Sequence, residues 1–146
     1  MLLETVEPEI LNALEDPVWE EIELAVDSGA TETVIGENIL KSIDLLEGMA
    51  YKRGVKYEVA NGIRIPNLCE KKFNGFTEDG MAREITAQVC EVNKPLLSVS
   101  KIVAAGNRVV FDPDGSYIED TESGEKVWLK NQGGMYMIKM WVKRGF

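Results

Sequence analysis

Hydrophobic and polar residues alternate along most of the chain, and this period of two is typical of β-strands. The first alternating run spans residues 18–26 and leads directly into Asp27. Two hairpins are expected next, at 55–65 and at 68–92, because each pair of runs is joined by a glycine-containing turn. Beyond Gly106, short runs separated by turns predict a β-meander with strands at 108–111, 117–119, 127–130 and 136–142.

Three segments instead repeat their hydrophobic residues at helical spacing. The first is 1–16, the second is 37–46 between two glycines, and the third lies within 95–106 and ends on Gly106. The pattern therefore predicts a mainly β fold with two or three short helices, followed by the C-terminal β-meander.

Composition places the chain among ordinary globular domains. Its 146 residues suit one domain with its own core, and 45% hydrophobic and 28% charged residues are close to globular averages. Histidine is absent, which excludes Ser-His-Asp and Cys-His catalysis and His-ligated zinc. Cys69 and Cys90 lack the spacing of metal ligands and are expected to be buried, inert thiols.

Charge and hydropathy restrict the partners and the compartment. The net charge of −9 repels phosphate, so direct binding to nucleic acid is not expected. No apolar run approaches the ~20 residues that cross a bilayer, so we expect no membrane span. Two isolated cysteines and a start without a signal-length apolar run predict an intracellular, reducing compartment, namely the cytoplasm.

The main candidate for chemistry is the segment Asp27-Ser28-Gly29-Ala30-Thr31. It places a carboxylate, a hydroxyl and a glycine in a turn directly after an apolar strand. Gly29 lets the backbone approach closely, Ser28 can hydrogen-bond across a symmetric contact, and Asp27 projects into the cleft that the turn lines. The tripeptide alone is also typical of an ordinary turn at the end of a strand, so its context has to decide.

Three ordered motifs resemble the retropepsin-like aspartic proteases, in particular the protease segment of copia-type retrotransposon polyproteins. Residues 23–31 look like the active-site strand and loop, 59–66 like the flap hairpin, and 96–102 like the segment that crosses beside the active-site loop. Residues 109–137 resemble the strand-rich region that follows the protease in those polyproteins. Together the likeness covers about residues 18–138.

The resemblance implies a retropepsin-like closed β-barrel or sandwich of hairpins. It divides the chain into an N-terminal helical segment at 1–17, a protease domain at 18–106 and a C-terminal β-meander extension at 107–146. The family is expected to have glycine where Cys69 stands, and many retroviral members have glycine where Ser98 stands.

The resemblance also implies a mechanism that needs no metal and no cofactor. The chain holds one Asp-Ser-Gly, so an active site needs Asp27 from each subunit of a homodimer, and the two carboxylates share one proton. One carboxylate activates a water molecule, and the other acts as general acid toward the scissile carbonyl of a peptide or polyprotein substrate. The implied catalytic motif is Asp27, Ser28 and Gly29, and the implied substrate contacts are Ala30 and Thr31 of the loop and Ala60, Asn61 and Gly62 of the flap.

A second hypothesis stays open at this point. A domesticated domain could have kept the fold, lost the activity and become a binding or accessory subunit of a larger protein complex. The intact motif at 27–29 favours the protease, whereas the acidic charge, the meander and the hydrophobic run at 135–142 are compatible with the accessory role. Oligomeric state distinguishes the two, because a monomer cannot assemble a pair of Asp27 side chains.

Overall fold

The computed structural model describes residues 18–145. Within this range the protein is mainly β and contains two short helices, which confirms the mainly β class that the alternating pattern predicted. The helix expected at 1–16, the segment assigned to 1–17 and residue Phe146 lie outside the described residues.

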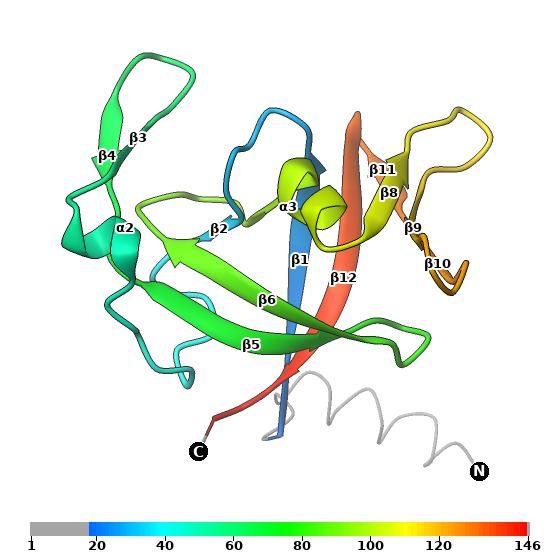
Figure 1. Cartoon of the computed structure of the whole chain (residues 1–146), viewed down its shortest axis with the longest axis horizontal. Helices are drawn as coiled ribbons and strands as arrows, with labels where there is room; N and C mark the ends of the chain where they lie inside the picture. Colours follow the sequence, from blue (N-terminus) through cyan, green and yellow to red (C-terminus); the bar gives the residue numbers. More distant parts are fainter. Residues whose placement is uncertain (1–17, 146) are drawn as a thin grey trace, which may run out of the picture.

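Seven strands form the main sheet, in the order β1-β7-β2-β6-β5-β12-β11. Strand β1 also pairs with β12, so the first six strands of that order close into a ring (Figure 1). β1 and β12 run antiparallel, from Trp19 opposite Lys143 to Ala25 opposite Met137. The bounds of these strands are β1 (Trp19–Asp27), β7 (Leu96–Ser98), β2 (Val34–Ile35), β6 (Ala82–Val89), β5 (Glu70–Phe76), β12 (Met135–Lys143) and β11 (Lys130–Gln132).

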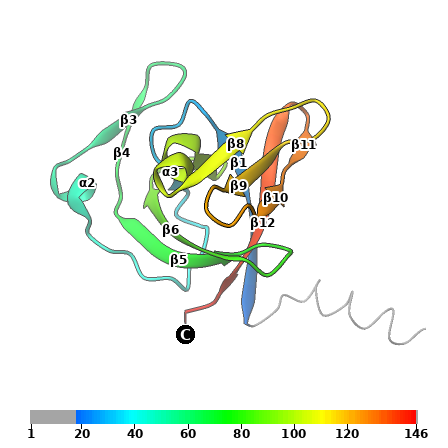
Figure 2. The ribbon, with the colours of Figure 1, turned by 45° about the vertical axis from the view of Figure 1, so that its right-hand side comes forward.

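Two smaller sheets and two helices lie outside the main sheet. The hairpin of β3 and β4 projects from one side of the molecule, and the three-stranded sheet β10-β9-β8 lies on the opposite side of α3 (Figures 1 and 2). The bounds of these elements are α2 (Met49–Lys52), β3 (Lys56–Glu58), β4 (Arg64–Pro66), α3 (Val99–Ala104), β8 (Asn107–Val110), β9 (Tyr117–Asp120) and β10 (Lys126–Trp128).

A single hydrophobic core joins the early and late parts of the chain. Buried aliphatic side chains of β1, β6 and α3 pack in one cluster with Ile118 of β9, Val127 of β10, and Ile138 and Met140 of β12. The strands that follow residue 106 therefore bury part of the same core, and β12 completes the same sheet. The domain boundary expected at 106 stays a prediction.

The helix predicted at 37–46 is wrong. This segment forms turns, in one of which the N–H of Ile43 donates to the carbonyl of Leu40 at 3.0 Å. Leu40 has a φ of +57°, which a right-handed helix cannot contain. In addition, the buried Lys71 donates from its Nζ to the carbonyl oxygens of Ile39 (3.1 Å) and Leu40 (2.7 Å). These tertiary contacts take up carbonyl groups that a helix would need, and they override the helical spacing.

Candidate functional site

The Asp27 loop begins where β1 leaves the core. Asp27 is the register partner of Ser98 in the parallel pairing of β1 with β7. Its Oδ1 accepts a hydrogen bond from the N–H of Gly29 at 2.8 Å. A Cβ on residue 29 would lie 3.3 Å from that oxygen, so the absence of a side chain at Gly29 avoids a close contact with the carboxylate. The loop therefore holds the Asp27 carboxylate in a defined position.

Ser98 fastens this loop to β7 and α3. The side chain of Ser98 is fully buried, and its Oγ donates to the carbonyl of Ala30 at 2.7 Å. Its backbone N–H donates to Oγ1 of the buried Thr33 at 3.1 Å. The Oγ of Ser98 also accepts from the N–H of Lys101 at 3.3 Å and so caps α3. One side chain thus ties together the candidate catalytic loop, a strand and a helix.

The tip of the loop is accessible. Asp27 and Ala30 are half-buried, whereas Ser28, Gly29 and Thr31 are exposed. A carboxylate at the edge of an exposed loop can meet a substrate or a second copy of the chain without rearrangement of the core.

The β3–β4 hairpin has the features expected of a flap. Gly62 takes a φ of +82° at its tip, and its N–H donates to the carbonyl of Val59 at 2.8 Å. The Oδ1 of Asn61 accepts from the N–H of Ile63 at 3.1 Å and shapes the turn. Ala60, Asn61 and Gly62 are all exposed. The hairpin projects from the same end of the molecule as the loop that follows β1 (Figures 1 and 2).

A buried amide anchors the base of the hairpin. The Nδ2 of Asn67 donates to the hydroxyl of Tyr57 at 3.0 Å and to Oε1 of Gln88 at 2.8 Å. Burial raises the pKa of Tyr57, so its hydroxyl is protonated at neutral pH. These contacts fix the lower part of the hairpin to β6, while its tip extends away.

A cleft of about 810 Å³ separates the Asp27 loop from the base of the hairpin. Thr31 and Glu32 line it from the loop, and Val55 and Tyr57 line it from the hairpin. Of the predicted site residues, Thr31 lines this cleft, whereas residues 27–30 and 60–62 do not. The structure therefore brings 27–31 together in one loop and leaves the hairpin tip apart from it.

Two residues of this region were not among the predicted site residues. Ser98 and Asn67 position the loop and the hairpin through the hydrogen bonds described above. For Ser98, the sequence did carry a signal, because it lies within the 96–102 motif. For Asn67, no local pattern distinguishes it from other polar residues near a strand.

Within residues 18–145, no group of three or more Cys, Asp or Glu side chains is arranged to hold a metal ion. No helix in this same range has the length and apolar character to cross a membrane. No protein-family model, no curated protein and no solved structure matches the chain.

Proposed function

We propose that the chain is an aspartic endopeptidase with a retropepsin-like fold that acts as a homodimer. The observation that carries this proposal is the placement of Asp27. Its carboxylate stands at the end of a buried strand, in an exposed loop tied to Ser98, and a glycine-tipped hairpin projects at the same end of the molecule.

The proposed chemistry uses two copies of Asp27 around a two-fold axis. Two carboxylates at about 3 Å cannot both ionise, so the pair holds one proton. The ionised Asp27 removes a proton from water as the water oxygen attacks the scissile carbonyl carbon. The protonated Asp27 gives its proton to the carbonyl oxygen. In the collapse of the tetrahedral intermediate, the Asp27 that took the proton from water gives it to the leaving nitrogen, the other Asp27 recovers a proton from a hydroxyl of the intermediate, and the C–N bond breaks to leave an acid and an amine.

The strand pairing within the chain limits which surfaces can form the contact between two copies. β12 pairs with β1 from Trp19 to Ala25 on one side, and β7 pairs with it from Ala25 to Asp27 on the other, so the end of β1 that carries Asp27 is already paired within the chain. The exposed residues Ser28, Gly29 and Thr31 are free of such pairing. We infer that the loops, rather than the edges of β1, supply the two-fold contact.

Cleavage of fluorescently labelled casein between pH 4 and 7 tests the proposal. Asp27→Asn is expected to abolish cleavage and to leave the thermal unfolding transition nearly unchanged, because the turn keeps its shape and only the shared proton is lost. Asp79→Asn, in an exposed turn, is the matched control and should cleave as the wild type does. Cleavage by Asp27→Asn at the wild-type rate would remove the assignment.

Dilution tests the homodimer. Since each chain supplies one Asp27, specific activity should fall as the protein is diluted through its monomer–dimer transition, in parallel with the dimer fraction from sedimentation. Activity plotted against pH should give a bell-shaped curve with its maximum below pH 7. The two limbs of this curve reflect the pair of Asp27 carboxylates acting together, not either carboxylate alone. A specific activity that does not change on dilution contradicts the paired mechanism.

The alternative proposal is a protease-like accessory domain without activity. It is favoured by the cleft beside the hairpin, whose lining does not include residues 27–29. Hydrogen exchange of the amides at 59–65, with and without pepstatin, separates the two functions. A working flap should gain protection when the inhibitor binds. Equal and strong protection in both samples supports the accessory role.

A further inference from the structure

Strand β6 has one edge that is paired along only part of its length. On one side β6 pairs with β5 from Ala82 to Gln88. On the other side, β2 covers only Gln88 and Val89. Among residues 18–145, no strand pairs with the first half of this second edge.

The hydrogen bonds at the end of β6 show which backbone groups point to the open edge. The N–H of Val89 donates to the carbonyl of Cys69, on the β5 side, at 2.8 Å. The N–H of Gln88 donates to the carbonyl of Thr33, on the β2 side, at 2.8 Å. Backbone groups of successive residues in a strand face opposite edges. The N–H and carbonyl groups of Glu84 and Thr86 therefore face the open edge.

A cavity of about 360 Å³ lies directly along this edge. Four consecutive residues, 83–86, line it, so the edge of the strand itself forms one wall. The remaining wall has two parts. Its aliphatic part comes from β7, α3 with the Ala105 that follows it, the three-stranded sheet and β12, and consists of Leu97, Ile102, Ala105, Ile118, Val127, Ile138 and Met140. Its polar part includes Glu32, Thr77, Lys101 and Asn107. The size lies within the range of ligand sites, and the aliphatic part of the lining suits an aliphatic side chain.

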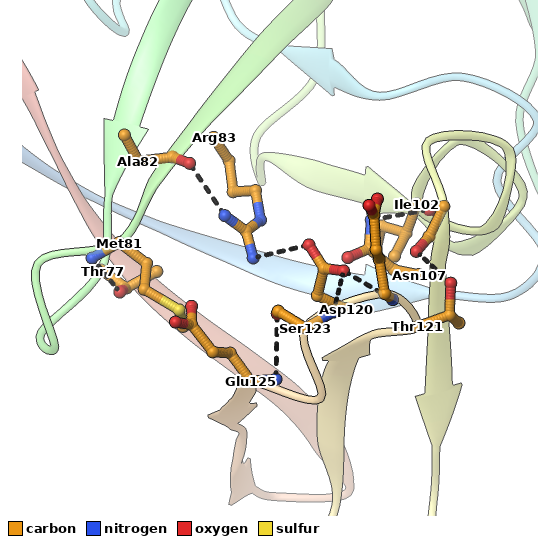
Figure 3. Close-up of polar contacts among 12 residues, drawn as sticks. Thr77, Met81, Ala82, Arg83, Ile102, Asn107, Asp120, Thr121, Ser123 and Glu125 are labelled. Atoms are coloured by element: carbon orange, nitrogen blue, oxygen red, sulfur yellow. Dashed lines mark hydrogen bonds and ion pairs between the residues drawn. The ribbon is translucent and has the colours of Figure 1, made fainter.

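The charged side chain of Arg83 occupies one end of the open edge of β6. The Nη1 of Arg83 donates to the carbonyl of Ala82 at 2.9 Å, so the side chain occupies the edge position before Glu84. The Nη2 of Arg83 lies 3.7 Å from Oδ2 of Asp120, at the end of β9 (Figure 3). Asp120 is held ionised, because backbone N–H groups of Ser123 and Glu122 lower its pKa. Arg83 thus ends the edge on one side, and the pairing of Gln88 ends it on the other.

We propose that this edge and cavity form a docking site for an extended peptide segment of a partner protein. The segment adds a strand beside β6, bonds to the backbone of Glu84 and Thr86, and inserts an aliphatic side chain into the cavity. Strand addition takes its affinity from main-chain hydrogen bonds and its selectivity from pockets for alternate side chains. This proposal does not rest on the protease activity, because Asp27 does not line the cavity.

The chemistry of the cavity sets the kind of segment. Isoleucine, valine or leucine fits a wall of aliphatic side chains, and a strand needs a donor and an acceptor at every other residue. Proline at the central positions removes a donor and is excluded. The predicted partner is therefore a short extended run with alternating aliphatic residues and no proline.

The test uses the Asp27→Asn protein, so that the probe is not cleaved. The probe is a fluorescent, end-blocked peptide with the sequence Lys-Val-Thr-Ile-Thr-Val-Lys. The matched control peptide carries N-methyl groups on two adjacent central residues. This change removes one backbone N–H donor from each edge of the peptide strand and leaves all side chains the same. Fluorescence anisotropy should show binding of the probe and at least about tenfold weaker binding of the methylated peptide.

Two protein variants locate the site. Ala105→Trp places a large side chain into the cavity from the end of α3 and should weaken binding at least about tenfold, because the probe loses the burial of its aliphatic side chain. Ala104→Trp, one residue earlier and equally exposed, does not line the cavity and should leave binding unchanged. Circular dichroism confirms that both variants fold.

Amide hydrogen exchange supplies a readout that needs no substitution in the site. On addition of the probe, hydrogen exchange at the amides of Glu84 and Thr86 should slow. Exchange at the amides of Arg83 and Ile85, which already face β5, should not change. Absence of binding, equal binding of the methylated peptide or an unaffected Ala105→Trp protein overturns the proposal. Protection of Glu84 and Thr86 that rises with protein concentration and needs no peptide also overturns it, in favour of a second copy of the chain.

Discussion

Cys69 occupies a backbone conformation that suits glycine. Its φ is +109°, where a Cβ atom crowds the backbone. The conformation is fixed from both sides, because the N–H of Cys69 donates to Oδ1 of Asn67 at 2.9 Å and its carbonyl accepts from the N–H of Val89 at 2.8 Å. The glycine that the family resemblance led us to expect at this position would fit without strain.

Replacing Cys69 with glycine is therefore expected to stabilise the protein. Relief of the strained φ should outweigh the extra freedom of glycine in the unfolded chain and raise the free energy of unfolding by about 1 kcal/mol. Urea unfolding in a reducing buffer measures the change. Cys69→Ala removes the same thiol but keeps the Cβ, so it serves as the control. Equal stability of the two variants would contradict the prediction.

Cys90 is expected to make the protein less stable at alkaline pH. Its side chain is fully buried, and burial raises the pKa of the thiol from 9.0 to about 11. The folded state keeps the proton that the unfolded state loses, so this stabilisation is complete below pH 9 and is lost as the pH rises toward 11. By about pH 10.5 the loss is about 2 kcal/mol.

Cys90→Ala isolates this contribution from other titrating groups. Urea unfolding at pH 8 and at pH 10.5 should show a larger decrease in stability for the wild type than for the variant. Parallel decreases in the two proteins would show that the Cys90 thiol does not carry the effect.

At the scale of elements, the sequence predicted strands better than helices. Alternation located β1, the second hairpin and β12, because every second side chain of these strands is more deeply buried than its neighbours over much of their length. The single strand predicted at 127–130 is wrong, since the structure has two strands there, β10 and β11, in different sheets. The spacing in 37–46 was ambiguous, since a buried turn can bury the same residues as a helix. Lys71, which donates to the carbonyls of Ile39 and Leu40 in place of a helix, lies some thirty residues later in the chain. The sequence does not show that this lysine is buried.

The candidate site was predictable to the extent that it is local. Asp27, Ser28 and Gly29 are contiguous, and glycine at a hairpin tip has a direct geometric meaning, which Gly62 shows with its positive φ. The fastening of the loop by Ser98 depends on the parallel contact of β1 with β7. Such a contact between distant segments leaves no periodic trace in the sequence.

Lys71 should be essential to the conformation of the segment at 37–46. The side chain is 3% exposed, and burial lowers the pKa of its ammonium group, while Glu20 opposes this shift. Lys71→Met leaves the carbonyls of Ile39 and Leu40 without their donor and should cost about 2 to 4 kcal/mol. Lys72→Met, on the exposed face of the same strand, should change stability by less than about 0.5 kcal/mol. Thermal and urea unfolding compare the two.

At the scale of the whole molecule, the last strand is part of the first sheet. β12 pairs along seven residues of β1 and contributes Ile138, Met140 and Val142, each no more than 3% exposed. The three-stranded sheet adds Ile118 and Val127 to the same core. The early part of the chain therefore depends on the late part for its packing.

A chain that ends after Gly106 is expected not to fold, although it contains the whole segment that resembles a protease. It lacks β12, so β1 keeps an unpaired edge and the core loses one wall. Circular dichroism and amide NMR spectra should show an unfolded chain. The full-length variant Ile138→Ala, which loses about 2 to 4 kcal/mol but keeps the backbone of β12, should still fold. Cooperative unfolding of the shortened chain would contradict this expectation.

The pairing of β1 with β12 also sets when the protein can fold during its synthesis. The two strands are the first and the last of the described chain, and Ala25 pairs with Met137. At a synthesis rate of about 5–20 residues per second, β1 leaves the ribosome roughly 5 to 20 s before its partner. β7, the other partner of β1, emerges within that interval, but the edge of β1 that pairs with β12 stays open until the interval ends. The earliest time at which the ring can close is therefore the emergence of β12, so the sheet cannot be completed before residues 135–143 have left the ribosome.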